Sequence, residues 1–153
     1  MPAVGQVAPA FALRAHTSVE VALSDLKGKR VVLYFYPKDA TPGCTVEAQE
    51  FRDRQAAFEA ANTVVIGVSP DSVASHCRFV EKQGLNFLLL ADTEQAAARA
   101  YGVWGEKSMY GRKYMGVRRA TFLIDEDGAI AAVWPKAQAK GHAAEVLETL
   151  ARI

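Results

Sequence analysis

The feature that most constrains this chain is an apolar strand followed at once by a helix start. Residues 31–36 form a continuous apolar run, which is typical of an interior strand in a sheet covered on both faces. Pro37 ends the run. Thr41 is a favoured N-cap residue, and Pro42 suits the first helical position, where no amide hydrogen is needed. The sequence therefore predicts a buried strand that leads, after a short turn, into a helix over residues 42–60.

Beyond this unit, predicted strands alternate with predicted helices. Val19, Val21 and Leu23 alternate with polar or small residues and indicate a half-buried strand. Ser69 and Pro70 repeat the cap-then-proline signal, so a second helix should begin there and end near Gly84. The other expected elements are strands at 63–68 and 87–90, helices at 94–101 and 141–152, a surface loop at 101–116, and a hairpin of strands 120–124 and 129–134.

This alternation predicts an α/β fold with a central mixed β-sheet flanked by helices. The chain has 153 residues, half of them hydrophobic, which suffices for one sizeable core. We therefore expect a single domain over residues 1–153. No composition shift, repeat or low-complexity segment divides the sequence.

The charge balance and the cysteine count exclude several classes of protein. With 18 basic and 17 acidic residues, the chain has no electrostatic reason to bind nucleic acid or an anionic membrane. No stretch approaches the ~20 apolar residues of a membrane span, and no secretory signal opens the sequence. Two cysteines are too few for a disulfide scaffold. We expect a cytoplasmic protein.

Cys44 falls at the third position of the predicted helix 42–60. Free backbone N–H groups and the positive end of the helix dipole favour an anion there, and such positions promote the thiolate form of a cysteine. Gly43 beside it leaves the approach to the sulfur open. The alternative is a buried structural cysteine, since free cysteines are among the most buried residues. The position favours the reactive thiol.

The same segment resembles a known family. Pro37, Thr41 and Cys44 match the Pro-x-x-x-Thr-x-x-Cys motif of peroxiredoxins, and the wider string is similar to the Q-type branch, the bacterioferritin comigratory proteins. The likeness continues in the stretches Val4-Gly5…Ala8-Pro9…Phe11, Leu23-Ser24-Asp25-Leu26-Lys27-Gly28-Lys29 and Arg119-Ala120-Thr121-Phe122-Leu123-Ile124-Asp125. The resemblance implies a thioredoxin-like fold and a thiol peroxidase that needs no metal or other cofactor. It also implies a hydroperoxide substrate, thioredoxin or a similar dithiol reductant, and a monomer.

The resemblance assigns roles to the motif residues. Cys44 would attack the peroxide O–O bond and become a sulfenic acid. The hydroxyl of Thr41 would accept a hydrogen bond from the bound hydroperoxide, a role compatible with helix capping. Pro37 would shield the sulfur from water, although ending the strand already explains this proline.

Glu47 and Arg119 form the predicted charged part of the site. Glu47 lies three residues after Cys44, on the same helix face, where its charge alone would oppose a thiolate. Arg119 precedes the predicted strand 120–124, at the family's position for an active-site arginine. Its guanidinium is suited to bind the carboxylate while facing the thiolate and the peroxide. Arg118 should point to the opposite face. A solvated Glu47 and a strand-edge Arg119 remain the alternative.

Cys77 leaves two interpretations open. Val73, Cys77 and Val80 have the spacing of an inward helix stripe, so this cysteine could be core packing. The resemblance offers a resolving cysteine that condenses with the Cys44 sulfenic acid. Some Q-type enzymes carry it five residues after the reactive cysteine, where this chain has Gln49, and others carry it on the helix that holds Cys77.

Three further groups of residues are weaker candidates for the site. We expect His76 to be an exposed helical residue rather than a metal ligand, because no third ligand has suitable spacing. Trp104, Tyr110 and Tyr114 either rim a substrate or reductant site or pin the long loop to the body. His142, like His16, belongs to no recognisable constellation.

Two other functions compete with the peroxidase. One is a redox sensor or holdase that passes oxidation to a partner and turns over peroxide poorly. The other is a thioredoxin-type disulfide oxidoreductase, which is disfavoured because no second cysteine lies near Cys44. Steady-state peroxide consumption coupled to thioredoxin separates the peroxidase from the sensor.

Overall fold

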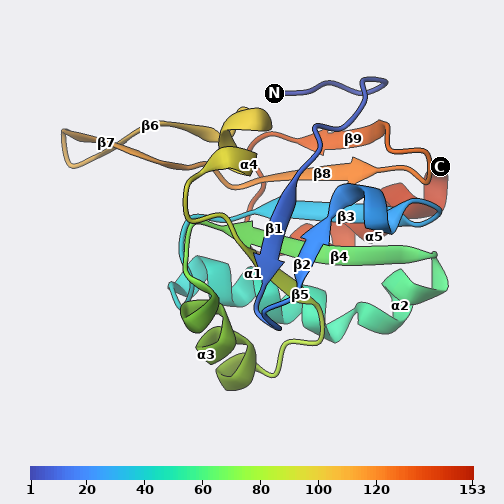
Figure 1. Ribbon diagram of the computed structural model, residues 1–153, viewed down its shortest axis with the longest axis horizontal. Helices are drawn as coiled ribbons and strands as arrows, with labels where there is room; N and C mark the ends of the chain where they lie inside the picture. Colours follow the sequence, from blue (N-terminus) through green and yellow to red (C-terminus); the bar gives the residue numbers. More distant parts are fainter.

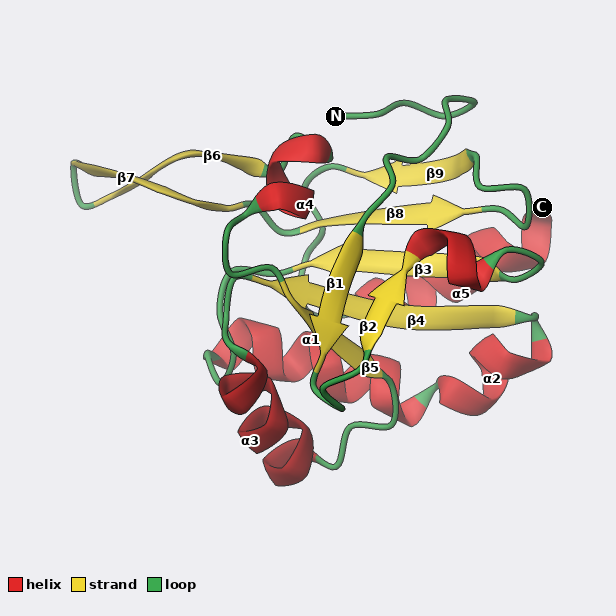
Figure 2. Ribbon diagram, viewed as in Figure 1, coloured by secondary structure: helices red, strands yellow, loops and turns green.

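The computed structural model describes all residues, 1–153, as a layered α/β structure (Figures 1 and 2). Seven strands form one sheet in the order β2-β1-β5-β4-β3-β8-β9, and β6 and β7 form a second, two-stranded sheet. The strands are β1 (Ala12–Ala15), β2 (Glu20–Ala22), β3 (Arg30–Phe35), β4 (Thr63–Ser69), β5 (Leu88–Ala91), β6 (Trp104–Met109), β7 (Arg112–Val117), β8 (Ala120–Ile124) and β9 (Ile130–Trp134). The helices are the 3-10 helix η1 (Leu23–Leu26), α1 (Pro42–Asp53), α2 (Gln55–Ala60), α3 (Val73–Gln83), α4 (Ala96–Ala100) and α5 (His142–Arg152).

The central strand β3 joins the parallel and antiparallel parts of the large sheet. It pairs in parallel with β4 and antiparallel with β8. β4 and β5 are also parallel, whereas β1 pairs antiparallel with β5 and β9 with β8. Parallel neighbours need crossover connections, which α1 and α2 supply between β3 and β4, and α3 between β4 and β5. The predicted α/β fold with a central mixed sheet and flanking helices is confirmed.

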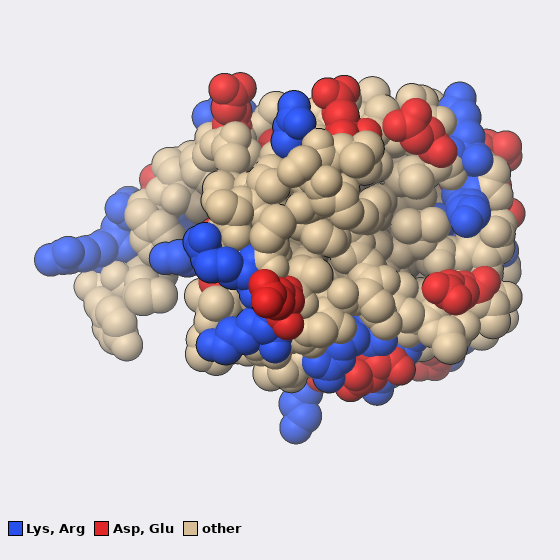
Figure 3. Space-filling model, turned by 60° about the horizontal axis from the view of Figure 1, so that its bottom comes forward, with Lys and Arg blue, Asp and Glu red and all other residues tan.

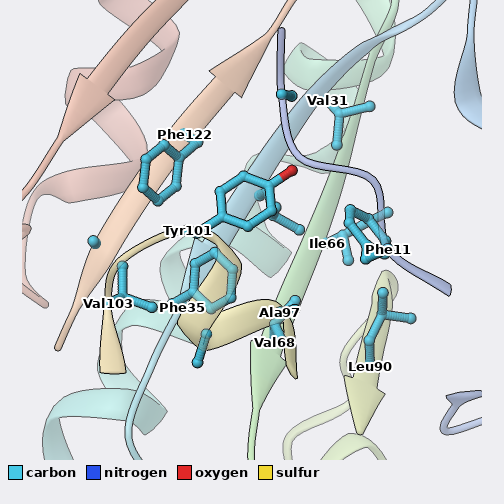
Figure 4. Close-up of a cluster of buried hydrophobic side chains, with 14 of the residues drawn as sticks. Phe11, Val31, Phe35, Ile66, Val68, Leu90, Ala97, Tyr101, Val103 and Phe122 are labelled. Atoms are coloured by element: carbon cyan, nitrogen blue, oxygen red, sulfur yellow. The ribbon is translucent and has the colours of Figure 1, made fainter. Parts of the chain in front are cut away.

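From Val31 onward, β3 is apolar because it faces a core on each side. Val31, Leu33 and Phe35 point into one cluster, together with Phe122 of β8 and Tyr101 at the end of α4 (Figure 4). The alternate residues point into a second cluster, which receives side chains from α1, α2, α3 and α5. The strand thus contributes one face to each core, and it ends at the turn that leads into α1.

The predicted helix over residues 42–60 is two helices. It is interrupted at Arg54, whose φ of −114° and ψ of 13° depart from helical values. Phe51 and Phe58, one on each side of the break, are both fully buried in the second core. The break changes the direction of the chain after α1 but leaves its start at Pro42, as predicted.

The predicted surface loop over residues 101–116 is wrong over most of its length. It forms the antiparallel hairpin β6–β7, which projects from the body in Figure 1. Tyr110 and Gly111 make the two-residue turn with φ values of 53° and 78°, a backbone that matches the twist of the two strands. The sequence does not signal this turn, because tyrosine rarely adopts a positive φ and the segment lacks the usual Asn-Gly or Asp-Gly pair.

Three smaller differences concern element boundaries. The helix α3 is capped by Ser72, whose Oγ accepts a hydrogen bond from the Ser75 amide at 3.1 Å, and not by Ser69. β1 was not predicted, and the strand expected over residues 19–23 ends at Ala22, where η1 begins. Gly84 closes α3 in the left-handed conformation, as its position at the end of the predicted helix indicated.

Acidic and basic side chains lie among one another on the face drawn in Figure 3. This mixture agrees with the near balance of charges in the sequence. No helix in the structure combines the length and apolarity that a bilayer crossing requires.

Candidate active site

Cys44 lies at the third position of α1, directly beyond the end of β3. Its side chain is buried in the second core, together with the side chains of Tyr36 and Phe51. The Nη2 of Arg119 donates to its sulfur at 3.3 Å. A thiol at this position therefore lies beside the positive charge of a side chain and at the positive end of the helix dipole.

Arg119 bridges Cys44 and Glu47. Its Nη1 donates to the Oε1 of Glu47 at 2.6 Å, and the Glu47 side chain is fully buried. Arg119 precedes β8, which pairs with β3, so the sheet holds the arginine opposite the start of α1. Its carbonyl also accepts a hydrogen bond from the Ala137 amide at 3.0 Å. The structure thus brings together three residues that the sequence separates.

Burial dominates the electrostatics of Glu47. It raises the pKa of this carboxyl from 4.5 to about 7, although the charge and the hydrogen bond of Arg119 act in the opposite direction. The second carboxylate oxygen, Oε2, is buried without a hydrogen-bond partner. For Arg119, burial opposes the charged form, but the negative charges of Glu47 and Cys44 outweigh it and raise its pKa.

Gly43 makes room for this arrangement. A Cβ added at this residue would lie 3.2 Å from the Nη2 of Arg119 and 3.7 Å from the Cβ of Ala139. The missing side chain therefore allows the guanidinium to approach the first turn of α1 closely. Arg118, in contrast, is exposed, and its guanidinium lies beside Gly105 of β6 instead of Cys44.

Thr41 and Pro37 lie on the turn between β3 and α1, and both are half-buried. Thr41 occupies the N-cap position of α1, as predicted, but its hydroxyl donates to the Lys38 carbonyl at 2.9 Å and makes no capping hydrogen bond. Its carbonyl accepts from the Thr45 amide at 2.9 Å, in the first turn of α1. The hydroxyl oxygen keeps lone pairs with which it can accept a further hydrogen bond.

The structure does not bring Cys77 to Cys44. Cys77 is exposed, and its thiol donates to the His16 carbonyl at 2.9 Å. The interpretation of Cys77 as core packing is therefore wrong, although Val80 of the same stripe packs against the second core. The face of α3 that packs on the sheet is centred on His76 and Phe79, which are both buried.

The prediction that His76 is exposed is also wrong, because this side chain is fully buried. Its Nδ1 lies 2.7 Å from the Oδ2 of Asp39 and its Nε2 lies 3.0 Å from the Leu90 carbonyl. Asp39, Asp71 and His76 place their potential metal-ligand atoms within 4.8 Å of one another. Hydrogen bonds inside the protein already engage these atoms. The sequence carries no signal for this cluster, since Asp39 and His76 are 37 residues apart.

The remaining aromatic and histidine candidates make no hydrogen bond to the Cys44 sulfur. Tyr110 is almost fully exposed at the tip of the β6–β7 hairpin, and the Arg99 guanidinium lies 5.9 Å from the Trp104 ring centre. His142 is buried, with its Nε2 2.7 Å from the Thr121 hydroxyl. Burial lowers the pKa of His142, which suits a neutral structural partner.

Lys107 is a cation near the site that the sequence did not indicate. Its Nζ donates to the Val117 carbonyl at 3.1 Å, and Val117 directly precedes Arg118 and Arg119 in the chain. Burial, together with the positive charge of Arg119, lowers the pKa of Lys107, while the charge of Cys44 acts in the opposite direction. We expected a loop over residues 101–116. A loop has no strand register, so the sequence could not predict that Lys107 lies on the same side as Arg119.

Comparison with known proteins places this geometry in a family. Residues 4–133 match the model of the AhpC/TSA family. The chain is 51% identical over 147 residues to peroxiredoxin Bcp of Bacillus subtilis, covering 96% of this chain and 94% of that protein. It is also 51% identical over 147 residues to a putative peroxiredoxin Bcp of Coxiella burnetii, covering 96% and 97% of the two chains.

Solved structures agree with these relatives. Peroxiredoxin Q of Xanthomonas campestris superposes with a TM-score of 0.89 at 40% identity, covering 93% of this chain and 90% of that one. A PrxQ variant from Xylella fastidiosa superposes with a TM-score of 0.94 at 38% identity, covering 99% and 97%. The fold is therefore that of the thioredoxin-like peroxiredoxins. From the family model, the relatives and the shared fold together, the chain belongs to the AhpC/TSA family, in its Bcp or peroxiredoxin Q branch.

Proposed function

We propose that this protein performs the thiol-dependent peroxidase reaction of its family through Cys44, Arg119 and Glu47. The observation that carries the proposal is the guanidinium of Arg119, which reaches the Cys44 sulfur at 3.3 Å and the Glu47 carboxylate at 2.6 Å. A sulfur nucleophile beside a fixed cation and a helix N-terminus is suited to attack an electrophilic oxygen.

In the first step, the Cys44 thiolate attacks the terminal oxygen of a hydroperoxide. The S–O bond forms as the O–O bond breaks, and the leaving oxygen takes a proton and departs as water or an alcohol. Negative charge moves from the sulfur to that leaving oxygen, so the Arg119 guanidinium lies where it can stabilise both ends of the displacement. Thr41 and Pro37 line the approach, with the Thr41 oxygen as an acceptor for the peroxide hydrogen.

In the second step, Cys77 resolves the Cys44 sulfenic acid. Its thiol gives up its proton and attacks the Cys44 sulfur, the S–S bond forms as the S–O bond breaks, and the hydroxide takes up a proton and leaves as water. A dithiol protein of thioredoxin type then reduces the disulfide by thiol exchange. The exposure of Cys77 supports this assignment, because the first mixed disulfide with a reductant needs an accessible sulfur.

The substrate class is hydrogen peroxide together with organic hydroperoxides. The bacterioferritin comigratory protein of Xanthomonas campestris has alkyl peroxide reduction activity, and its structure superposes on this chain with a TM-score of 0.91 at 38% identity. We extend that activity to this protein. We further propose that residues 1–153 act as one domain, as a monomer, in the cytoplasm.

The test is steady-state consumption of hydrogen peroxide and of an alkyl hydroperoxide, coupled through thioredoxin and its reductase to NADPH oxidation. We expect sustained turnover that depends on each component. A single stoichiometric oxidation without turnover would instead indicate the redox sensor. Sedimentation of the reduced and oxidised protein tests the monomer.

A further inference from the structure

The two cysteines occupy separate environments in the reduced protein. Cys44 is buried beside Arg119, whereas the Cys77 thiol is exposed and bonded to the His16 carbonyl. A disulfide requires the two sulfur atoms to approach to about 2.05 Å. Resolution by Cys77 therefore requires α3, the start of α1, or both, to leave the positions seen here.

The side chain of Asp39 ties these two moving segments together. Asp39 lies on the turn between β3 and α1, five residues before Cys44. Its Oδ2 accepts a hydrogen bond from the Ser75 hydroxyl at 2.8 Å and lies 2.7 Å from the His76 Nδ1, both on the first turns of α3. Its Oδ1 accepts from the Tyr36 hydroxyl at 2.6 Å, and its amide donates to Asp71, just before α3, at 2.9 Å.

Both ring nitrogens of His76 have a polar partner inside the protein. Its Nε2 faces the Leu90 carbonyl, which can only accept, and its Nδ1 faces the Asp39 carboxylate. Burial opposes ionisation of Asp39, but hydrogen bonds from His76 and Tyr36 outweigh it and hold the pKa of that carboxyl below its ordinary value. Asp39 and His76 are therefore a buried hydrogen-bonded pair.

The backbone beside this pair is also restrained. Ala40, next to Asp39, holds a φ of 63°, a region that residues with a Cβ rarely adopt. Such a backbone persists only where its surroundings fix it, and the Asp39 hydrogen bonds supply that restraint.

We propose that the Asp39–His76 pair is a latch that positions the helix of Cys77 against the turn of Cys44, and that it opens before the two cysteines join. The disulfide part of this proposal rests on the resolving role proposed for Cys77. The latch sets how long Cys44 remains a sulfenic acid. While it is closed, a second peroxide can oxidise that sulfenic acid to sulfinic acid, with the peroxide oxygen transferred to sulfur and water or alcohol released.

The test compares His76→Gln with Arg78→Gln, a control at an exposed position of the same helix. Reduced protein is mixed with one equivalent of hydrogen peroxide, quenched at intervals with an alkylating reagent, and analysed by mass spectrometry. We expect the ratio of disulfide formation to first oxidation to rise at least five-fold in His76→Gln, and the sulfinic acid formed by excess peroxide to fall similarly. A ratio within two-fold of the control, or below it, overturns the latch.

Two milder variants keep the proposal testable if His76→Gln fails to fold. Ser75→Ala and Tyr36→Phe each remove one hydroxyl that donates to Asp39 and leave the Asp39–His76 pair in place. We expect a two- to three-fold rise in the same ratio for each. If neither variant changes the ratio, Asp39 does not restrain resolution.

Hydrogen exchange separates the latch from the role of Cys77. In reduced Cys44→Ser protein, His76→Gln should speed amide exchange in peptides covering residues 72–80 at least ten-fold relative to Arg78→Gln. Unchanged exchange overturns the latch even where the disulfide forms. Faster exchange, together with a Cys77 thiol that stays free when protein retaining Cys44 is treated with peroxide, keeps the latch and overturns the disulfide step together with the proposed function of Cys77.

Discussion

The Nη2 of Arg119 lies 3.3 Å from the sulfur of Cys44, although 75 residues separate the two in the chain. The contact exists because β8 pairs with β3, so the residue before β8 meets the helix that follows β3. Glu47 fixes the guanidinium from its other side. The order of the strands in the sheet thus places the positive charge of Arg119 beside the reactive sulfur.

Cys44→Ser should abolish peroxidase turnover while leaving the fold intact. The serine hydroxyl keeps the volume and the helix position but is not a thiolate nucleophile. Coupled NADPH oxidation and far-UV circular dichroism measure the two properties. A variant that keeps even a tenth of wild-type turnover would show that another residue is the nucleophile.

Arg119→Ala should slow the first oxidation of Cys44 by about 100-fold, the scale for removing one preorganised donor from a reacting centre. The thiolate fraction at neutral pH should also fall, because the sulfur loses the positive charge and the hydrogen bond of the guanidinium. Stopped-flow oxidation and thiolate absorbance at 240 nm measure both effects. Arg118→Ala is the control and should change the rate less than about three-fold, being exposed and away from Cys44. Equal losses of oxidation rate in the two variants would contradict the assignment of Arg119 as the active-site arginine.

Gly43→Ala should reduce the first oxidation rate about three-fold without a large loss of stability. The added Cβ would lie 3.2 Å from the Arg119 Nη2, so the guanidinium must shift by a few tenths of an ångström. Stopped-flow kinetics and urea unfolding measure the two effects. An unchanged rate would mean that the arginine position tolerates this displacement.

Glu47→Gln should remove a pH-dependent part of the stability. In the folded state the pKa of Glu47 is raised from 4.5 to about 7, so the folded protein binds the proton more tightly than the unfolded chain. Its contribution to stability is therefore fully present below pH 4.5 and is lost as pH rises to about 7. The loss is on the order of 3 kcal/mol.

Urea unfolding between pH 4.5 and 8 checks this prediction. The stability of Glu47→Gln relative to wild type should rise across that window, whereas Glu81→Gln, at an exposed position of α3, should follow wild type. A constant difference between Glu47→Gln and wild type at all pH values would show that Glu47 stays ionised throughout.

Cys77→Ser should still undergo the first oxidation but stall as sulfenic acid and over-oxidise more readily. In the wild type, one equivalent of peroxide should give an intramolecular Cys44–Cys77 disulfide in the monomer. Non-reducing peptide mapping with mass spectrometry detects both outcomes. A free Cys77 thiol after peroxide, with thioredoxin-coupled turnover unchanged in Cys77→Ser, would make this a one-cysteine enzyme.

Short-range patterns predicted the part of the site that lies on one continuous segment. The apolar run of β3, the proline at the first position of α1 and Cys44 two residues later are local features, and the structure has each at its predicted place. Residue spacing alone did not decide between a contact of Arg119 with Glu47 and two solvated side chains. The resemblance to the family favoured the contact. The sequence also determined the mixed α/β fold, because strands and helices have different apolar periods.

Tertiary contacts decided which face of α3 is buried. Helix periodicity alone left the stripe of Val73, Cys77 and Val80 as acceptable as one centred on His76. The second arrangement is the one formed, because Asp39 and the Leu90 carbonyl, distant in sequence, satisfy both ring nitrogens of His76. Rotating α3 to bury Cys77 would leave those polar groups without partners. Hydrogen bonds between separate segments, which no local pattern encodes, thus left Cys77 on the surface.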